Sequence, residues 1–191
     1  MFDQLHYDDI TFDKTILNDA FINRKEFQSC TFRNCDFSNS NFAHNKFLDC
    51  VFEECNLSMI KFDASTLNDV FFKGCKILAV NFSLCQDFLF SVNFDACILD
   101  YASFAGKKMV KTRFKKSSLK EVSFTETNLA GSVFDESDLL DAVFNRTDLS
   151  AVNFTTAYNF ILDPELNVLK KAMFSTSGLE GLLAKYGLKV V

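Results

Sequence analysis

Seven cysteines and two histidines are the residues of this chain best suited to bind a metal or attack a substrate. Close pairs of thiols would bind a soft metal or form disulfides. No Cys-x-x-Cys pair occurs, however, and neither His6 nor His44 has a serine, cysteine or acid at a spacing typical of a catalytic centre. A glycine-rich phosphate-binding loop is also missing from the sequence. We therefore expect no enzyme activity, no cofactor and no metal.

The element that positions these residues is a repeat of five. From residue 2 to residue 82 every fifth residue is large and apolar, in all 17 cases, although the chain as a whole is only 48% hydrophobic. These anchors are Phe2, Tyr7, Phe12, Leu17, Ile22, Phe27, Phe32, Phe37, Phe42, Phe47, Phe52, Leu57, Phe62, Leu67, Phe72, Ile77 and Phe82. The period matches neither an α-helix nor an ordinary β-strand. It indicates a repeat architecture.

The ladder of anchors is interrupted once and then resumes. The later anchors are Phe94, Leu99, Phe104, Met109, Phe114, Leu119, Phe124, Leu129, Phe134, Leu139, Phe144, Leu149 and Phe154. Because Phe82 and Phe94 are twelve residues apart and two repeats would take ten, we predict a two-residue insertion. We expect this bulge within Leu84–Leu89, with Leu89 as the intervening anchor.

The position two residues before each anchor usually holds a small side chain, which predicts that it points inward beside the anchor. Six of the cysteines occupy this position, namely Cys30, Cys35, Cys50, Cys55, Cys75 and Cys97, and Cys85 keeps the phase of the first ladder. We expect all seven to be buried, reduced thiols that act as small apolar residues. A thiol ladder that binds a soft metal is the alternative.

Five residues that turn a corner and repeat predict a square coil, with four units and twenty residues in each turn. Anchors twenty residues apart should then stack in columns. One column reads Phe12, Phe32, Phe52 and Phe72, and it continues after the insertion as Phe94, Phe114, Phe134 and Phe154. Because the columns keep their character across the insertion, we expect a bulge at one corner of a continuous stack.

Segments such as Ser40-Asn41-Phe42, Cys55-Asn56-Leu57, Thr127-Asn128-Leu129 and Ser137-Asp138-Leu139 resemble the pentapeptide repeat, A(D/N)LXX with Leu or Phe at its centre. The resemblance covers roughly residues 2–158. It implies an all-β solenoid, a right-handed quadrilateral β-helix. We assign residues 1–160 to this β-helix and residues 161–191 to a C-terminal cap.

The C-terminal cap has its own signals. Asp163 followed by Pro164 predicts a short helical turn, and Phe174 follows Phe154 by twenty residues, which predicts one last strand. The segment Ser177-Gly178-Leu179-Glu180 reads as a capping box that opens a short amphipathic α-helix ending at Gly187. The apolar residues expected to form a dimer interface are Leu179, Leu182, Leu183, Tyr186 and Leu188. Covering the open end of the β-helix is the other role of this helix.

The stretch from Leu162 to Leu188 also resembles the C-terminal segment of Qnr-type quinolone-resistance proteins. These are dimeric pentapeptide repeat proteins, joined through their C-termini, that protect DNA gyrase and topoisomerase IV and have been viewed as mimics of duplex DNA. The resemblance implies a cytoplasmic bacterial rod. No apolar run reaches the length of about 18 residues that spans a membrane, and the N-terminus does not resemble a signal peptide.

Charge is consistent with an acidic rod, because the formal net charge is −5. The acidic residues that we expect to contact gyrase or topoisomerase IV are Glu53, Glu54, Asp95, Asp135, Glu136, Asp138 and Asp141. A basic belt interrupts this acidity and comprises Lys107, Lys108, Lys111, Arg113, Lys115, Lys116 and Lys120. The belt is expected to be a solvated face, and the global charge makes direct nucleic-acid binding unfavourable.

A second class of function stays open. A non-catalytic scaffold without a topoisomerase role would bind a partner through its flat faces. Exposed Phe71, Phe88 and Phe90 are the expected contacts for such a scaffold.

Overall fold

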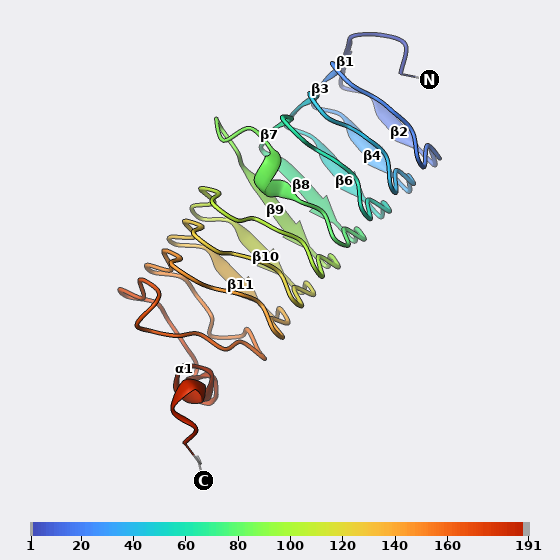
Figure 1. Ribbon diagram of the computed structural model, residues 1–191. Coiled ribbons are helices and arrows are strands. Elements are labelled where there is room, and N and C mark those ends of the chain that lie inside the picture. Colours follow the sequence, from blue (N-terminus) through green and yellow to red (C-terminus); the bar gives the residue numbers. More distant parts are fainter. Residues whose placement is uncertain (1, 189–191) are drawn as a thin grey trace.

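The chain turns a corner once in every five residues. After almost all anchors the residue two positions later forms the corner and adopts left-handed backbone, with φ of 52° at Lys14, 53° at Asn34 and 63° at Gly74. The residues between corners are extended, so four corners close one coil and residues about twenty apart lie side by side. The computed structural model describes residues 2–188, which form a continuous stack of parallel coils (Figure 1).

Two of the four sides carry strands. On one side the order is β1 (His6–Asp8), β3 (Glu26–Gln28), β5 (Lys46–Leu48) and β7 (Thr66–Asn68). The adjacent side runs through β2 (Thr11–Asp13), β4 (Thr31–Arg33), β6 (Val51–Glu53), β8 (Val70–Lys73), β9 (Val92–Asp95), β10 (Arg113–Lys115) and β11 (Val133–Asp135). The other two sides are joined by isolated parallel bridges such as Asp36 to Asn56 and Asn41 to Lys61. The predicted all-β solenoid is confirmed.

The interior is filled by columns of stacked rings. Ring centroids are 4.6 Å apart between Phe32 and Phe52 and 4.8 Å apart between Phe114 and Phe134, with nearly parallel planes. Rings of neighbouring columns meet edge to face, as Phe104 does with Phe114. Both geometries suit the quadrupoles of aromatic rings and add about 0.5–1.5 kcal/mol per pair beyond burial.

The small inward residue links each coil to the one before it. Its hydroxyl or thiol donates a hydrogen bond to an anchor carbonyl of the preceding coil, over 3.2 Å from Ser137 to Phe114 and 3.3 Å from Cys50 to Phe27. Burial raises the pKa of the Cys50 thiol to about 12, so this group keeps its proton and remains a donor. All seven cysteines are buried and free, as predicted.

The two-residue insertion is confirmed, and the range in which it lies overlaps the predicted Leu84–Leu89. Strand partners are twenty residues apart in β6 and β8, twenty-two apart in β8 and β9, and twenty apart again in β9 and β10. The Gln86 N–H still follows the regular register, bonding to the Ser65 carbonyl, whereas the Ser91 N–H reaches the Leu67 carbonyl. The extra residues therefore lie in 87–91, which we call the bulge, after a 3₁₀ turn at Phe82–Leu84.

The prediction that Leu89 is the intervening anchor was wrong. Leu89 is exposed and has φ of 58°, whereas Phe90 is buried in the core. Within the bulge the chain departs from the five-residue spacing, and the aromatic side chain after Leu89 turns inward. Phe90 is accordingly not an exposed contact residue.

The stack ends in a cap. The Phe174 ring stacks on Phe154 at 5.2 Å, and a single bridge joins Met173 to Asn153 where a last strand was predicted. A 3₁₀ turn (Thr176–Leu179), the α-helix α1 (Glu180–Leu183) and another 3₁₀ turn (Ala184–Tyr186) follow.

The predicted end of this helical segment is confirmed, because Gly187 is left-handed with φ of 60°. Its predicted start was wrong. The side chain that accepts from the Gly178 N–H is Ser175, not Ser177, because the segment begins with a 3₁₀ turn that lies two residues earlier than the capping box suggested.

Candidate interaction surfaces

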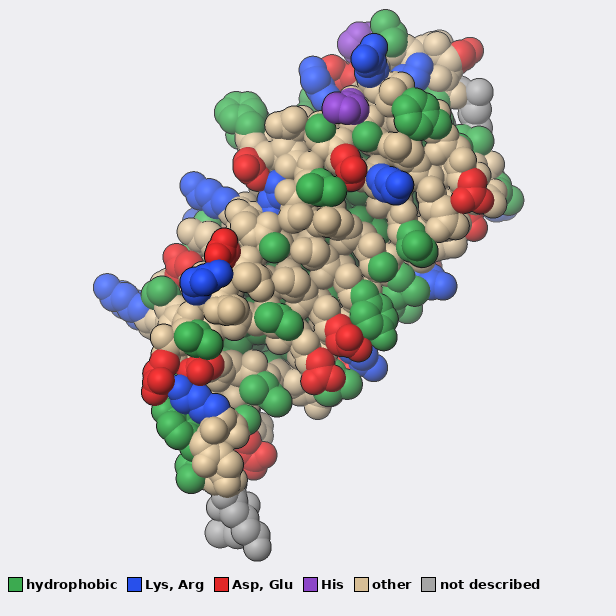
Figure 2. Space-filling model, in the orientation of Figure 1, with side chains coloured by type: hydrophobic (Ala, Val, Ile, Leu, Met, Phe, Trp, Pro, Cys, Tyr) green, Lys and Arg blue, Asp and Glu red, His purple; other side chains and the backbone are tan. Residues whose placement is uncertain are grey.

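Acidic and basic side chains are interspersed over the surface of the rod. Figure 2 shows both signs along the length of one face, with no large area of a single charge. A surface of this kind attracts partners through local groups of charges rather than through one uniform field. The position of each acidic residue relative to its basic neighbours therefore decides which carboxylates are available.

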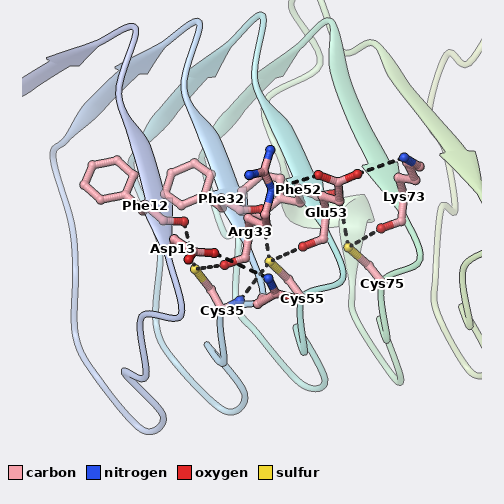
Figure 3. Close-up of polar contacts among 11 residues, drawn as sticks. Phe12, Asp13, Phe32, Arg33, Cys35, Phe52, Glu53, Cys55, Lys73 and Cys75 are labelled. Atoms are coloured by element: carbon pink, nitrogen blue, oxygen red, sulfur yellow. Dashed lines mark hydrogen bonds and ion pairs between the residues drawn. The ribbon is translucent and has the colours of Figure 1, made fainter.

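A column of alternating charge runs along the sheet of β2 to β11. It consists of the residues that directly follow the Phe anchors, which strand pairing brings side by side (Figure 3). In order they are Asp13, Arg33, Glu53, Lys73, Asp95, Lys115 and Asp135. This charge ladder contains three of the predicted contact residues, and each of the three adjoins at least one base.

Glu53 is the most strongly paired member of the ladder. One carboxylate oxygen lies 2.8 Å from the Lys73 Nζ and the other 3.0 Å from the Arg33 Nε. The hydrogen bonds from Lys73 and then Arg33 lower the pKa of Glu53. Asp95 is paired less closely, with Lys115 at 3.4 Å. Both carboxylates are thus largely neutralised as long-range charges.

The remaining predicted residues lie on the next corner and the next side of the coil. Glu136 is 3.9 Å from Lys116, and Asp138 is 3.5 Å from Lys120, so the basic belt pairs with both. Glu54 and Asp141 are exposed and form no ion pair in the part of the chain that the structure describes. Of the seven predicted residues, Glu54 and Asp141 are therefore the freest.

Glu121 is an acidic residue that the sequence argument left out of the site. It occupies the same corner column as Asp141, twenty residues earlier, and its N–H bonds to the Leu140 carbonyl next to Asp141. Both side chains are exposed and neither has an ion pair within residues 2–188. The spacing of twenty residues between two acids at the corner position was the signal that could have identified this pair.

The prediction that the whole basic belt is solvated was wrong for Lys107. Its side chain is only 2% exposed, because it occupies the inward position two residues before the Met109 anchor. The ammonium donates to the Cys85 carbonyl and to the Asp87 carboxylate, both at 2.5 Å, and lies 5.5 Å from the centre of the Phe90 ring. Lys107 thus ties the bulge to the coil above it.

The bulge held by Lys107 presents apolar side chains to solvent. Phe88 is 78% exposed and Leu89 is 56% exposed. A hollow of about 450 Å³ lies beside them, and its wall includes Val110 and the ammonium-bearing side chains of Lys108 and Lys111. Phe71, the other aromatic residue expected in a scaffold contact, is exposed by about a third on the sheet face.

At the C-terminal end the five predicted interface residues behave differently. Leu182 packs against the core, whereas Leu179, Leu183, Tyr186 and Leu188 are exposed. Leu183 and Leu188 border an apolar hollow of about 440 Å³, together with exposed Leu140 and Ile161 of the last coils.

Glycine explains why the cap sits so close to the last coil. A Cβ atom on Gly181 would lie 2.2 Å from the Phe160 carbonyl oxygen, and one on Gly178 would lie 2.9 Å from the Phe160 ring. The Leu162 N–H bonds to the Gly181 carbonyl at 3.0 Å. The two glycines, which lower helix propensity, thus provide the close approach of α1 to the β-helix.

An ionic clamp also fastens the cap. The Lys185 ammonium lies 2.6 Å from the Asp163 carboxylate and 2.9 Å from that of Glu165. The Tyr186 hydroxyl donates to Glu165 at 3.1 Å. These hydrogen bonds lower the pKa of both carboxyl groups and raise that of Lys185.

The described residues contain no group of three or more His, Cys, Asp or Glu side chains placed to hold a metal ion. Across residues 2–188, no helix has the length and apolar character needed to cross a bilayer.

A model of the pentapeptide repeat region matches residues 25–87 and 87–154, which is more than half of the chain. The chain belongs to the pentapeptide repeat family. The fold of this pentapeptide repeat protein is similar to that of QnrB1, a plasmid-mediated fluoroquinolone resistance protein. Full-length QnrB1 matches with a TM-score of 0.60 and 17% sequence identity, over 93% of this chain and 100% of QnrB1.

Two trypsin-treated variants of QnrB1 match similarly. One has a TM-score of 0.62 and 19% identity, over 95% of this chain and 99% of the other. The second has a TM-score of 0.61 and 18% identity, over 97% of this chain and 91% of the other. Among curated proteins, none matches the sequence.

Proposed function

We propose that this pentapeptide repeat protein is a non-catalytic, cytoplasmic rod of the Qnr type that binds DNA gyrase or topoisomerase IV and reduces quinolone action. The observation that carries the proposal is the likeness to QnrB1 along almost the whole of both chains. The other observation is the net charge of −5, which favours a DNA-binding surface over DNA itself.

The free carboxylates are the best candidates for contact with such a basic surface. In the charge ladder Glu53 and Asp95 already have ammonium or guanidinium partners, and a topoisomerase would have to displace them. Glu121 and Asp141 have no such partner in the described residues, and Glu54 also lies on a corner. We therefore assign the strongest contribution to Glu121 and Asp141, with Asp135, Glu136 and Asp138 of the same coil as supporting charges.

The test is a gyrase supercoiling assay with ciprofloxacin, with and without the purified protein, accompanied by direct binding measurements at low and high salt. Wild-type protein should restore supercoiling, and its affinity should fall as salt screens the contact. Glu121→Gln with Asp141→Asn should weaken binding about tenfold at low salt.

The control variant, Glu53→Gln with Lys73→Gln, removes one ion pair of the charge ladder. It keeps the net charge of the protein and should bind gyrase like wild type. Absence of both binding and protection would overturn the proposal.

Homodimerisation through the cap is part of the same proposal. Leu179, Leu183, Tyr186 and Leu188 expose apolar surface at one end of the rod, where a second copy would cover it. Leu179→Asp with Leu183→Asp should convert a dimer to a monomer in sedimentation velocity without changing the circular dichroism of the β-helix. Leu182 is unsuitable for this test because it packs against the core of its own chain. A wild-type protein that sediments as a monomer would contradict dimerisation.

A scaffold without a topoisomerase role is the second candidate, and the bulge favours it. Phe88 and Leu89 are exposed on a segment that the buried Lys107 holds in place, beside a hollow with basic walls. Wild-type protein that neither binds gyrase at low salt nor changes quinolone inhibition would favour this scaffold over the topoisomerase proposal.

A further inference from the structure

The first coil of the rod has a free β-sheet edge. Within residues 2–188, β1 and β2 are the terminal strands of the two sheets, and each pairs with the next coil only. In every later coil the N–H before the anchor bonds downward, as Thr31 does to the Ile10 carbonyl at 2.9 Å. The equivalent N–H of Thr11 therefore points to the uncovered side, at the opposite end of the rod from α1 (Figure 1).

A buried hydroxyl at this edge has no hydrogen-bond partner. Thr15 is only 4% exposed, and its Oγ1 makes no hydrogen bond within residues 2–188. The same inward position one coil later is Cys35, whose thiol donates to the Phe12 carbonyl of the coil before it at 3.3 Å. By analogy with Cys35, a backbone carbonyl of an added extended segment would accept a hydrogen bond from the Thr15 hydroxyl.

Apolar side chains are exposed on several sides of the first coil. Ile16 is 72% exposed and Phe21 is 69% exposed, and Leu5 and Ile10 are also exposed. A hollow of about 550 Å³ lies on the side of the first coil that carries Phe21, away from β2, and its lining includes Phe2, Arg24 and Lys25. Phe2 covers the core itself through edge-to-face contacts with rings of the first two coils, but the strand edge of β2 is left open.

The charge of the first coil identifies the kind of partner. Residues 2–25, up to the start of β3, contain five aspartates, all exposed, against the three basic residues Lys14, Arg24 and Lys25. None of the five aspartates forms an ion pair among residues 2–188. A second copy would bring five more aspartates to the same place, whereas a segment with lysine or arginine flanks would be attracted.

We propose that the free edge of β2 binds an extended, basic-flanked peptide segment of a partner protein as one more parallel strand. The segment accepts the Thr11 N–H and the Thr15 hydroxyl with its backbone carbonyls. Its apolar side chains pack on Ile10 and Ile16, and its flanking cations approach Asp9 and Asp19. Addition of a strand to an open sheet edge is a common mode of peptide recognition.

The test uses a fluorescent synthetic peptide of alternating valine and threonine with paired lysines at both ends, and fluorescence anisotropy as the readout. A peptide with glutamates in place of the lysines is the control. Wild-type protein should bind the lysine peptide at least about tenfold more tightly than the glutamate peptide at low salt.

Two variants separate the strand edge from the charges. Thr11→Pro removes an N–H that faces no coil in the described chain, so the fold should persist while affinity falls about tenfold. Asp9→Asn with Asp19→Asn keeps residues that tolerate the left-handed corner and should weaken binding about threefold. The matched control, Glu121→Gln with Asp141→Asn, removes two charges far from the edge and should bind the peptide like wild type.

Equal affinity for the two peptides, or unchanged binding to Thr11→Pro, would overturn the proposal, as would no binding of the lysine peptide. Self-association of wild-type protein that Thr11→Pro abolishes would assign the edge to a second copy and would also overturn it. Loss of gyrase protection in the Glu121 and Asp141 variant leaves this peptide test unaffected, so the two proposals fail separately.

Discussion

The two open ends of the β-helix are covered to different extents. At the C-terminal end α1 approaches Phe160 so closely that a Cβ atom at position 181 would clash with it. Ion pairs from Lys185 to Asp163 and Glu165 also hold this segment in place. At the N-terminal end the Phe2 ring covers the core, while the edge of β2 and the Thr15 hydroxyl stay without partners in the described chain. An open solenoid end is a template for further strands, so a covered end limits growth of the stack and an uncovered end can accept a partner.

The largest difference in stability between the ends should come from the aromatic residues that cover them, Phe160 and Phe2. Phe160→Ala should cost about 3–5 kcal/mol of unfolding free energy, because Phe160 is buried between the last coil and the cap. Phe2→Ala should cost less, about 1–2 kcal/mol, because Phe2 is only partly buried. Urea unfolding followed by circular dichroism measures both. Equal costs would show that the N-terminal end is closed as firmly as the C-terminal end.

The closeness of the cap gives the next prediction. Gly181→Ala should destabilise the cap by about 2 kcal/mol, because the new Cβ meets a backbone oxygen that cannot move aside. The same change in an exposed helix would stabilise by about 1 kcal/mol, so the sign is diagnostic. Gly178→Ala is the control with a smaller cost, since the Phe160 ring can rotate. Limited proteolysis of the cap together with thermal unfolding provides the measurement.

One buried threonine near each end allows the contribution of a buried hydroxyl to stability to be compared between the ends. Thr147→Val removes a hydroxyl that donates to the Phe124 carbonyl at 2.7 Å and should cost about 1 kcal/mol. Thr15→Val removes a buried hydroxyl without a partner and should be neutral or stabilise the protein by up to about 1 kcal/mol. Chemical denaturation of the two variants checks this. A loss at Thr15 equal to that at Thr147 would mean that the N-terminal hydroxyl is already satisfied.

The smallest predicted effect is the pH dependence of the ionic clamp. Since Lys185 lowers the pKa of Asp163 and Glu165, the clamp stabilises the fold above the unfolded carboxyl values of about 4. This contribution to stability is lost as the pH falls through the lowered pKa values that the two carboxyl groups have in the folded protein. The pKa of Lys185 is raised, so its contribution is present below about pH 10 and lost only at higher pH.

Lys185→Met should therefore flatten the decline of melting temperature between pH 5 and 3 slightly relative to wild type. Lys171→Met is a control that removes a nearby exposed lysine outside the clamp. A wild-type decline no steeper than that of Lys185→Met would argue against the clamp.

The charge ladder shows how much of a site sequence reasoning can reach. A spacing of twenty residues places Asp13, Arg33 and Glu53 in one column as soon as the repeat is recognised. That the carboxylate of Glu53 then bonds to both of its basic neighbours depends on side-chain lengths and rotamers. The sequence therefore predicted acidic residues on the surface, but not which of them are free to meet a partner.

The sequence by itself determined the solenoid, because its period of five residues turns two side chains of each unit inward. One is the large apolar anchor, and the other is the small residue two positions before it. The Phe columns, the buried cysteines and the continuation of the stack from Phe72 to Phe94 all follow from that period. Where the period breaks, only the tertiary structure decided. At the bulge Phe90 rather than Leu89 turns inward, and the long side chain of Lys107 reaches back to the Cys85 carbonyl. At the cap Gly181 meets Phe160. In these places a contact between coils, and not a local pattern, decides which side chain is buried.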